Sequence, residues 1–301
     1  MATAKPRVAL FSGWILLGLL SASSASGGTV YNFESCNLGP IGVWSGGPPP
    51  GCENWYTPTV GGSVSAQVEP YTAMAPYGLA VDPNGGNNFL GLVLTPSGVT
   101  RAQHDFNFSA SEQWSISYDL DAVNMTLTGG DTTYGSYYIG GFSVFTINAG
   151  TASFIVDEAW DSSATDSTYS VLYFVYDASG DALNGGNGTT AWSGLLQNNW
   201  YTQSTLFDTK TNQILLVSLI NLTTGVTSSF SPSGWYMLGG LDRQFLPQGV
   251  PNVDPNAFRV AGMGATNGFL VDNFDLDAVP EPATLLLTGL GLIGLIAFRR
   301  R

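Results

Sequence analysis

Apolar and polar residues alternate with a period of two along much of this chain, and that pattern restricts it to β-strands. From Trp114 to Asp121, large apolar residues alternate with serine and aspartate, so one face of a strand meets a core and the other meets water. Two nearly continuous apolar runs, Val171–Tyr176 and Ile214–Ile220, predict central strands covered on both faces. Glycine-rich turn signals separate the runs, and residues 27–278 show no 3.6-residue apolar stripe. The pattern predicts an all-β fold, an antiparallel sandwich or barrel.

Two further features refine this fold. Residues 199–219 predict a hairpin whose first strand ends at Asp208 before a short polar turn, and residues 30–34 and 268–276 predict strands that open and close the domain. These features resemble the hairpins and end strands of concanavalin-A-like and laminin-G-like jelly rolls. The resemblance implies a concanavalin-like jelly-roll β-sandwich in which the two end strands are neighbours.

The N-terminal residues 1–26 have the three parts of a secretory signal peptide. Lys5 and Arg7 are basic, Val8–Leu20 is apolar, and Ser23 and Ala25 form a small-residue cleavage signal. We expect a signal helix that is removed on export. A retained anchor is the alternative, which the shortness of the apolar run disfavours.

The C-terminal residues 279–301 predict a second membrane-directed segment. Sixteen mostly apolar residues, Ala283–Phe298, precede a basic end, and this order is typical of a stop-transfer signal. As a helix they span roughly 24 Å, somewhat less than a hydrocarbon core of about 30 Å, so the predicted transmembrane helix is a marginal anchor. The motif residues on either side of the apolar run are Pro280, Glu281, Pro282, Arg299, Arg300 and Arg301.

This tail resembles the PEP-CTERM sorting signal of Gram-negative bacteria. The resemblance implies export across the inner membrane, transient residence there, processing near the Pro-Glu-Pro by an exosortase, and delivery to the cell surface or extracellular matrix. An ordinary C-terminal anchor is the alternative reading of the same residues.

Between these ends, residues 27–278 are long enough for one large core, so we expect a single extracellular domain. Its only basic residues are Arg101, Lys210, Arg243 and Arg259, against twenty-one acidic ones, which gives a net charge of −17. Nucleic acids and anionic lipid surfaces are therefore unfavourable partners, whereas cations suit this charge.

The two cysteines, Cys36 and Cys52, predict a disulfide because the chain is exported. The bond would close a fifteen-residue loop rich in glycine and proline, and loops of that size contribute about 3 kcal/mol in the chain-entropy model. A reactive or metal-binding pair is the alternative, but there is no CxxC spacing to support it.

Catalytic patterns are missing from the sequence. His104 is the only histidine and no GxSxG motif is present, so neither a serine triad nor a zinc centre is expected. The best carboxylate candidates, Asp157 and Glu158, should lie on opposite faces of one strand, which is the wrong geometry for a glycosidase pair. We therefore expect no catalytic residues.

Aromatic residues beside turns are candidates for sugar contacts, since flat rings supply large contact areas. We expect most of them to belong to the core all the same. These candidates are Trp55, Tyr56, Tyr134, Tyr137, Tyr138, Trp192, Trp235 and Tyr236.

The predicted pairing of the end strands brings Glu34 close to Asp272 with few basic residues nearby. Two neighbouring carboxylates raise each other's pKa, and Ca²⁺ accepts such oxygen ligands. We therefore predict a structural Ca²⁺ held by Glu34 and Asp272, with Asn273 as a further ligand. In the alternative interpretation, these residues only hydrogen-bond to the backbone.

Two functions follow. The first, which the PEP-CTERM resemblance implies, is a non-enzymatic exported protein associated with exopolysaccharide or another carbohydrate. The second is a secreted glycoside hydrolase on a concanavalin-like scaffold. The missing catalytic patterns favour the first.

Overall fold

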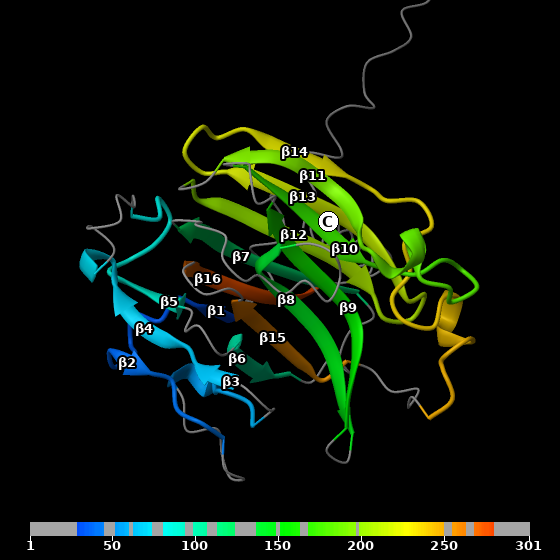
Figure 1. The fold of residues 1–301 in the computed structure, drawn as a ribbon, viewed down its shortest axis with the longest axis horizontal. Helices are drawn as coiled ribbons and strands as arrows, with labels where there is room; N and C mark the ends of the chain where they lie inside the picture. The colour runs from blue at the N-terminus through cyan, green and yellow to red at the C-terminus, as the bar shows by residue number, and fades with distance from the viewer. Residues whose placement is uncertain are drawn as a thin grey trace, which may run out of the picture.

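The computed structural model shows two β-sheets packed face to face (Figure 1). All the strand pairings within them are antiparallel except that of β3 with β6. The structure describes residues 29–44, 52–59, 63–73, 81–93, 99–106, 113–123, 137–148, 151–162, 168–196, 199–249, 255–262 and 268–279.

The larger sheet has nine strands in the order β14-β13-β12-β7-β16-β5-β4-β2, with β1 paired to β16. The bounds of its strands are β1 Thr29–Tyr31, β2 Gly39–Pro40, β4 Gln67–Pro70, β5 Asn88–Val93, β7 Gln113–Val123, β12 Tyr201–Asp208, β13 Gln213–Asn221, β14 Thr227–Phe230 and β16 Gly268–Val279.

The smaller sheet has seven strands in the order β11-β10-β9-β8-β15-β6-β3. The bounds of its strands are β3 Ser63–Ser65, β6 Val99–Asp105, β8 Tyr137–Asn148, β9 Thr151–Ser162, β10 Thr168–Phe174, β11 Thr189–Leu196 and β15 Ala257–Gly262. Short 3-10 turns complete the described elements, at η2 Cys52–Asn54, η3 Tyr71–Ala73, η7 Leu183–Gly186 and η8 Leu241–Arg243.

One hydrophobic core lies between the sheets and draws side chains from both. Strand β7 confirms the predicted alternation, because Trp114, Ile116 and Tyr118 are buried in this core. The expectation that its aspartates face water was wrong. Asp119 and Asp121 are only 2% and 0% exposed, and the segments that carry Tyr71 and Asn84 lie over Asp119 on the other face of the nine-stranded sheet.

The predicted hairpin and closing strand are confirmed, whereas the opening strand, predicted over residues 30–34, ends at Tyr31 and is followed by a turn in which Phe33 has a φ of +57°. Strand β12 ends at Asp208 and pairs with β13, and Asp208 accepts hydrogen bonds from the turn amides of Lys210 and Thr211. Strand β1 lies beside β16, with Tyr31 opposite Phe274. Of the run Val171–Tyr176, only Val171–Tyr173 is buried on both faces, because Phe174 and Tyr176 are half-buried, and alternate residues of β13 are half-buried as well. The prediction of two covered faces is therefore confirmed only in part for β10 and was wrong for β13, and both strands lie second from the edge of their sheets.

Within the described ranges, no helix has the length and apolar character needed to cross a membrane. The predicted signal peptide at residues 1–26 and the predicted transmembrane helix at residues 283–298 both lie outside those ranges.

Candidate functional site

The disulfide holds a loop segment beside a polar surface of the seven-stranded sheet. Cys36 and Cys52 are bonded, as the sequence predicts, with their Cα atoms 5.4 Å apart. The chain after Cys52 then runs beside β6, where Tyr56 and Gln103 exchange backbone hydrogen bonds of 2.8 and 2.9 Å. The bond therefore holds a loop segment against the edge of the seven-stranded sheet.

The outer face of that sheet carries two arginines. Ala102 on β6 and the flanking residues Phe258 and Val260 on β15 point into the core, so the intervening Arg101 and Arg259 point to the opposite, outer face. Arg259 lies directly opposite Gln103 in the ladder, and Ala261 lies opposite Arg101. The two arginines are therefore diagonal neighbours on adjacent strands.

A chain of hydrogen bonds crosses this outer face. The Arg259 guanidinium donates to Oε1 of Gln103 at 2.9 Å, and the Gln103 amide donates to the Tyr56 hydroxyl. Tyr56 in turn donates to a carboxylate oxygen of Asp105 at 2.7 Å. Arg101 donates to the Ser63 hydroxyl at 2.8 Å. We call these residues, Arg101, Gln103, Asp105, Arg259 and Tyr56, the arginine face.

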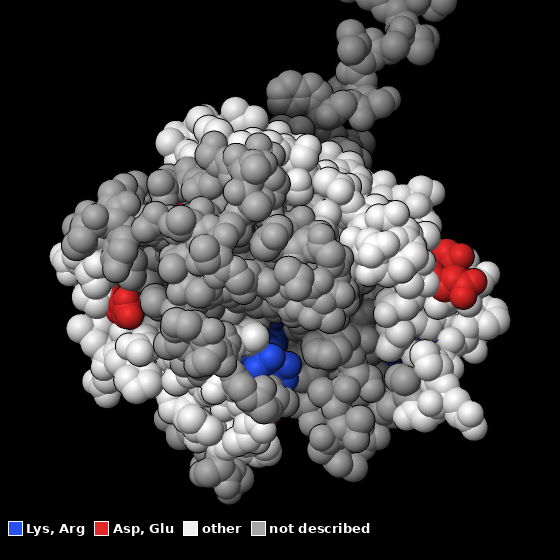
Figure 2. Space-filling view, viewed as in Figure 1, with Lys and Arg blue, Asp and Glu red and all other residues white. Residues whose placement is uncertain are grey.

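The arginine face has an aromatic ring at its border. Figure 2 shows a small basic patch over the region of β6 and β15, while the acidic residues visible in this view lie near the edges of the molecule. Trp44 is 39% exposed, and its ring lies 5.7 Å from that of Tyr56. Polar groups beside an exposed indole can hold a sugar by hydrogen bonds and ring stacking.

Most of the aromatic candidates whose side chains the structure describes lie elsewhere. Trp55 is fully buried and Trp235 is 8% exposed, both in the core. The indole of Trp192 donates to the Ser228 hydroxyl at 3.1 Å, and Tyr236 pairs with Tyr176 through the backbone. Tyr134 lies outside the described residues, and the side chains of Tyr137 and Tyr138 are not described. Of the candidates whose side chains are described, Tyr56 alone lies on the arginine face.

The predicted calcium ligands meet on the outer side of the nine-stranded sheet. Glu34 accepts hydrogen bonds from the backbone amides of Asn87 and Asn88 at 2.6 and 2.7 Å. Asp272 accepts one from the Tyr71 hydroxyl at 2.8 Å. Gly85 and Gly86 lie between them: a Cβ on Gly86 would come within 2.3 Å of Glu34, and one on Gly85 within 2.7 Å of Asp272. Only glycine leaves room for this close approach.

Two further aspartates complete this acidic cluster, and the sequence analysis missed both. Asp119 lies opposite Asp272 in the ladder between β7 and β16, and Asp82 comes from the turn before β5. A bulge in β16 gives Asn273 a φ of +46° and aims its amide at both aspartates, with hydrogen bonds of 3.1 Å to each. In the sequence, the turn motif Asp82-Pro-Asn-Gly-Gly86 is the feature that could have indicated this site.

In the acidic cluster, burial raises the pKa values of Asp82, Asp119 and Asp272. Burial, followed by repulsion from Asp119, raises the pKa of Asp82 to about 7. Burial likewise raises the pKa of Asp272 to about 7, and the Asp119 and Glu34 charges raise it further against the Tyr71 and Asn273 hydrogen bonds. Burial also raises the pKa of Asp119. For Glu34, hydrogen bonds from the backbone lower the pKa despite the opposing effect of burial.

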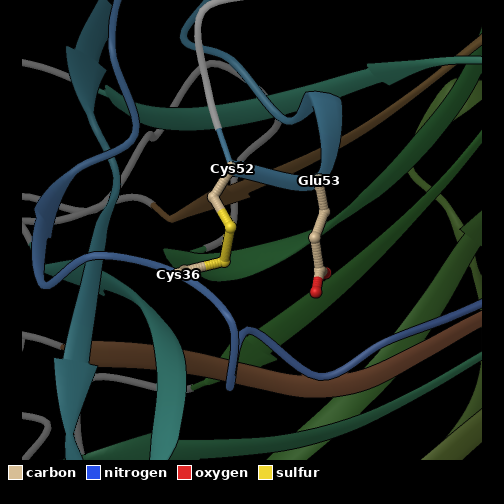
Figure 3. Close-up of side chains that lie close together, drawn as sticks. All are labelled: Cys36, Cys52 and Glu53. Carbon is tan, nitrogen blue, oxygen red and sulfur yellow. A yellow bond between two sulfur atoms is a disulfide. The ribbon is translucent and has the colours of Figure 1, made fainter.

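The donor chemistry of this cluster suits Ca²⁺, which takes carboxylate and amide oxygens. The alternative interpretation also has support, because protein hydrogen bonds already occupy oxygens of Glu34 and Asp272. Among the described residues, three potential metal-binding atoms lie within 4.8 Å of one another only at Cys36, Cys52 and Glu53 (Figure 3). Both of those sulfurs are consumed by the disulfide, so this second group is no metal site.

Of the three groups considered for catalysis, His104 and Glu158 lie in the interior, and the side chain of Asp157 lies outside what the structure describes. His104 is 6% exposed and stacks on Phe106, and each of its ring nitrogens lies within 2.9 Å of a backbone carbonyl oxygen. Glu158 is 3% exposed and accepts hydrogen bonds from Tyr118, Trp160 and Tyr173. Burial raises the pKa of Glu158 to about 7.

Comparison with known families concerns the C-terminal end. Residues 278–301 match the family model described as the PEP-CTERM protein-sorting motif. The chain carries a PEP-CTERM sorting signal. The match includes Pro280, Glu281, Pro282 and the three terminal arginines, and it marks a protein exported across the membrane and sorted to the cell surface of a Gram-negative bacterium. A PEP-CTERM motif of this kind implies processing by an exosortase.

No curated protein matches this chain. Similar solved structures include lectin II from Ulex europaeus, with 9% identity, a TM-score of 0.38, and coverage of 62% of this chain and 86% of the lectin. An alginate lyase from Pseudomonas aeruginosa has 10% identity and a TM-score of 0.40, with 83% and 100% covered. The exoplasmic/lumenal domain of VIP36, bound to Ca²⁺ and Man3GlcNAc, has 8% identity and a TM-score of 0.39, with 65% and 81% covered. At these scores the likenesses carry no argument about ligand or activity.

Proposed function

We propose that this protein is a non-enzymatic polysaccharide-binding protein of the cell surface or extracellular matrix. An exosortase processes its tail while the inner membrane holds it transiently, and the β-sandwich then binds exopolysaccharide. The observation that carries the proposal is the exposed indole of Trp44 at the border of the arginine face.

Sugar binding suits this surface for two physical reasons. An indole that is 39% exposed offers an apolar face on which a pyranose ring can stack, while Tyr56 fixes one side of it. Beside it, the half-buried Arg101 and the exposed Asp105 can supply a donor and an acceptor. The buried Gln103, Tyr56 and Arg259 hold this part of the sheet in place by their mutual hydrogen bonds. A rigid site loses little conformational entropy on binding.

The glycoside hydrolase alternative finds less support in the described residues. A hydrolase needs two carboxyl groups about 5–10 Å apart on either side of a sugar. Glu158 faces the core, bonded to three aromatic side chains, and His104 is enclosed by Phe106 and backbone carbonyls. Neither group can reach a polymer outside the sandwich.

A structural Ca²⁺ at the acidic cluster accompanies this function. Glu34, Asp272 and Asn273 would hold it as the sequence predicts, with Asp82 and Asp119 as added oxygen donors. Bound there, the ion would neutralise carboxylates whose mutual repulsion raises their pKa values. It would tie the opening and closing parts of the domain together.

The test is a glycan-array screen of the disulfide-intact protein, followed by titration with the polysaccharide that binds. The Trp44→Ala variant should bind about tenfold more weakly, the effect expected from losing about 1.4 kcal/mol of stacking. Phe245→Ala is the matched control, because Phe245 is 53% exposed but lies near Gly180, away from Tyr56. Equal losses in both variants, or no binding to any glycan, would refute the proposal. Release of reducing ends from the bound polymer would revive the hydrolase.

A further inference from the structure

We infer that removal of the signal peptide creates an ion pair between the new N-terminal ammonium group and the carboxylate of Asp277, near the end of β16. The precursor cannot form this pair, because the same nitrogen is then part of an uncharged peptide bond. The inference uses the cleavage predicted near Gly27 and the pairing of β1 with β16. It goes beyond polysaccharide binding and does not depend on it.

The first argument is the register between the two end strands. Strand β1 runs antiparallel to β16, with Thr29 opposite Leu276, and Asp277 is the residue that follows Leu276 in β16. A chain that begins at Gly27 has its ammonium nitrogen only two residues before Thr29. An extended chain advances at most about 3.6 Å per residue, and Gly27 and Gly28 are free to turn. The ammonium group can therefore reach the Asp277 carboxylate.

The second argument is the environment of that carboxylate. Phe274 and Leu276 point into the core, so Asp275 and Asp277 share the outer face of β16. Asp277 is only 9% exposed, and it repels Asp275, whose Oδ1 is buried without a hydrogen-bond partner. The neutral Ser115 lies opposite Asp277 on β7, and no basic side chain among the described residues contacts either aspartate. A carboxylate buried in this way is costly unless a cation joins it.

The third argument is the scarcity of other cations. Residues 27–278 have four basic side chains. Arg101 and Arg259 lie on the outer face of the other sheet, Arg243 is buried and donates to Asn212 at 3.1 Å, and Lys210 lies in the exposed turn after β12. A free α-amino group has a pKa of about 7.7–8.0, so it is protonated at neutral pH, and a neighbouring carboxylate raises its pKa further.

Such a pair would fasten the start of the domain to its closing strand. Strand β1 has only three residues, Thr29–Tyr31, so few ladder hydrogen bonds hold it against β16. An ion pair at the open end of β1 adds to them. Because the signal peptide is cleaved only on export, the domain reaches its full stability outside the cytoplasm.

The experiment measures the pKa of the α-amino group in mature protein isolated from the host. Once residues 1–26 are removed, Lys210 is the only lysine, so reductive methylation with ¹³C-formaldehyde labels just two amino groups. Methylation keeps the positive charge, and NMR follows both signals from about pH 6 to about pH 11, with Lys210 as the internal reference. We expect the α-amino group to titrate above about 9, against about 7.7–8.0 for a free N-terminus.

Asp277→Asn removes the partner charge and should return the titration to about 8. Asp181→Asn, at an exposed turn position, is the matched control and should leave it above about 9. Titration of the native α-amino group near 8 would overturn the inference, whether or not either variant folds. A raised value that persists in Asp277→Asn would also overturn it, as would a mature chain that mass spectrometry finds to begin more than two residues from Gly27. None of these results bears on polysaccharide binding.

Discussion

The acidic cluster makes a quantitative prediction about pH and stability. Asp272 is fully buried, lies opposite Asp119 in the ladder, and has Glu34 nearby. Replacing Asp272 by Asn keeps the shape of the side chain and a hydrogen-bonding partner for Tyr71, but removes one ionisable group. The Asp272→Asn variant should therefore be less sensitive to pH than the native protein in the absence of divalent cations.

The direction in which stability changes with pH follows from the raised pKa of Asp272. Asp272 has a pKa of about 7 in the folded state against 3.8 ordinarily, so between these values the folded protein holds a proton that the unfolded chain has lost. Stability is then fully present below about pH 4 and is lost as the pH rises through about 7. The rise in pKa corresponds to at most about 4 kcal/mol. Solvent screening and proton sharing within the cluster reduce the expected loss to about 2 kcal/mol.

The assay is urea unfolding followed by tryptophan fluorescence at pH 5 and pH 8, with EDTA present. Native protein should lose about 2 kcal/mol more than Asp272→Asn between these two pH values. Asp181→Asn, at an exposed turn position, is the control for the general effect of removing one charge, and it should keep the native pH dependence. An Asp272→Asn variant with that same native dependence would show that the raised pKa is not real.

The remaining predictions concern the cation, the disulfide and the chain ends. With Ca²⁺ at a hundredfold excess over its Kd, unfolding of the native protein at pH 8 should require about 2.7 kcal/mol more than in EDTA, and Asp272→Ala should abolish the difference; identical melts would exclude the ion. Reduction of the Cys36–Cys52 bond should lower the unfolding free energy by about 3 kcal/mol and weaken polysaccharide binding, because Tyr56 follows the bond in the chain; unchanged stability would contradict this. Mass spectrometry of mature protein from the host should find a chain that begins near Gly27 and ends near the Pro-Glu-Pro, and an intact Arg301 terminus in that pool would be inconsistent with processing.

Local patterns in the sequence were sufficient to predict the strands, but not their surroundings. The alternation around Trp114 and the turn after Asp208 depend on neighbouring residues, and both appear in the structure as predicted. The burial of Asp119 depends instead on what covers the outer side of its sheet, including Tyr71 and Asp82 from distant parts of the chain. The alternation of residues identifies the two faces of a strand. It does not show whether another segment of the chain covers the outer face.

The candidate sites also differ in whether local sequence patterns or long-range packing bring their residues together. Pairing of the end strands could be predicted from the jelly-roll resemblance, and it placed Glu34 near Asp272. The arginine face could not be predicted, because Arg101 and Arg259 are brought together only by the pairing of β6 with β15. The residues next to Arg101 and Arg259 in the sequence do not indicate that the two side chains lie close together, since strand order in a sheet is set by long-range packing.

Side-chain footprinting by hydroxyl radicals tests most directly whether polysaccharide binds at the arginine face. Trp44, Phe245 and Leu196 are all exposed, at 39%, 53% and 54%, so mass spectrometry can follow the oxidation of each. With saturating polysaccharide, oxidation of Trp44 should fall severalfold while Phe245 and Leu196 react as before. Unchanged oxidation of Trp44 in the saturated complex, or protection of Phe245 or Leu196 in its place, would contradict binding at this face.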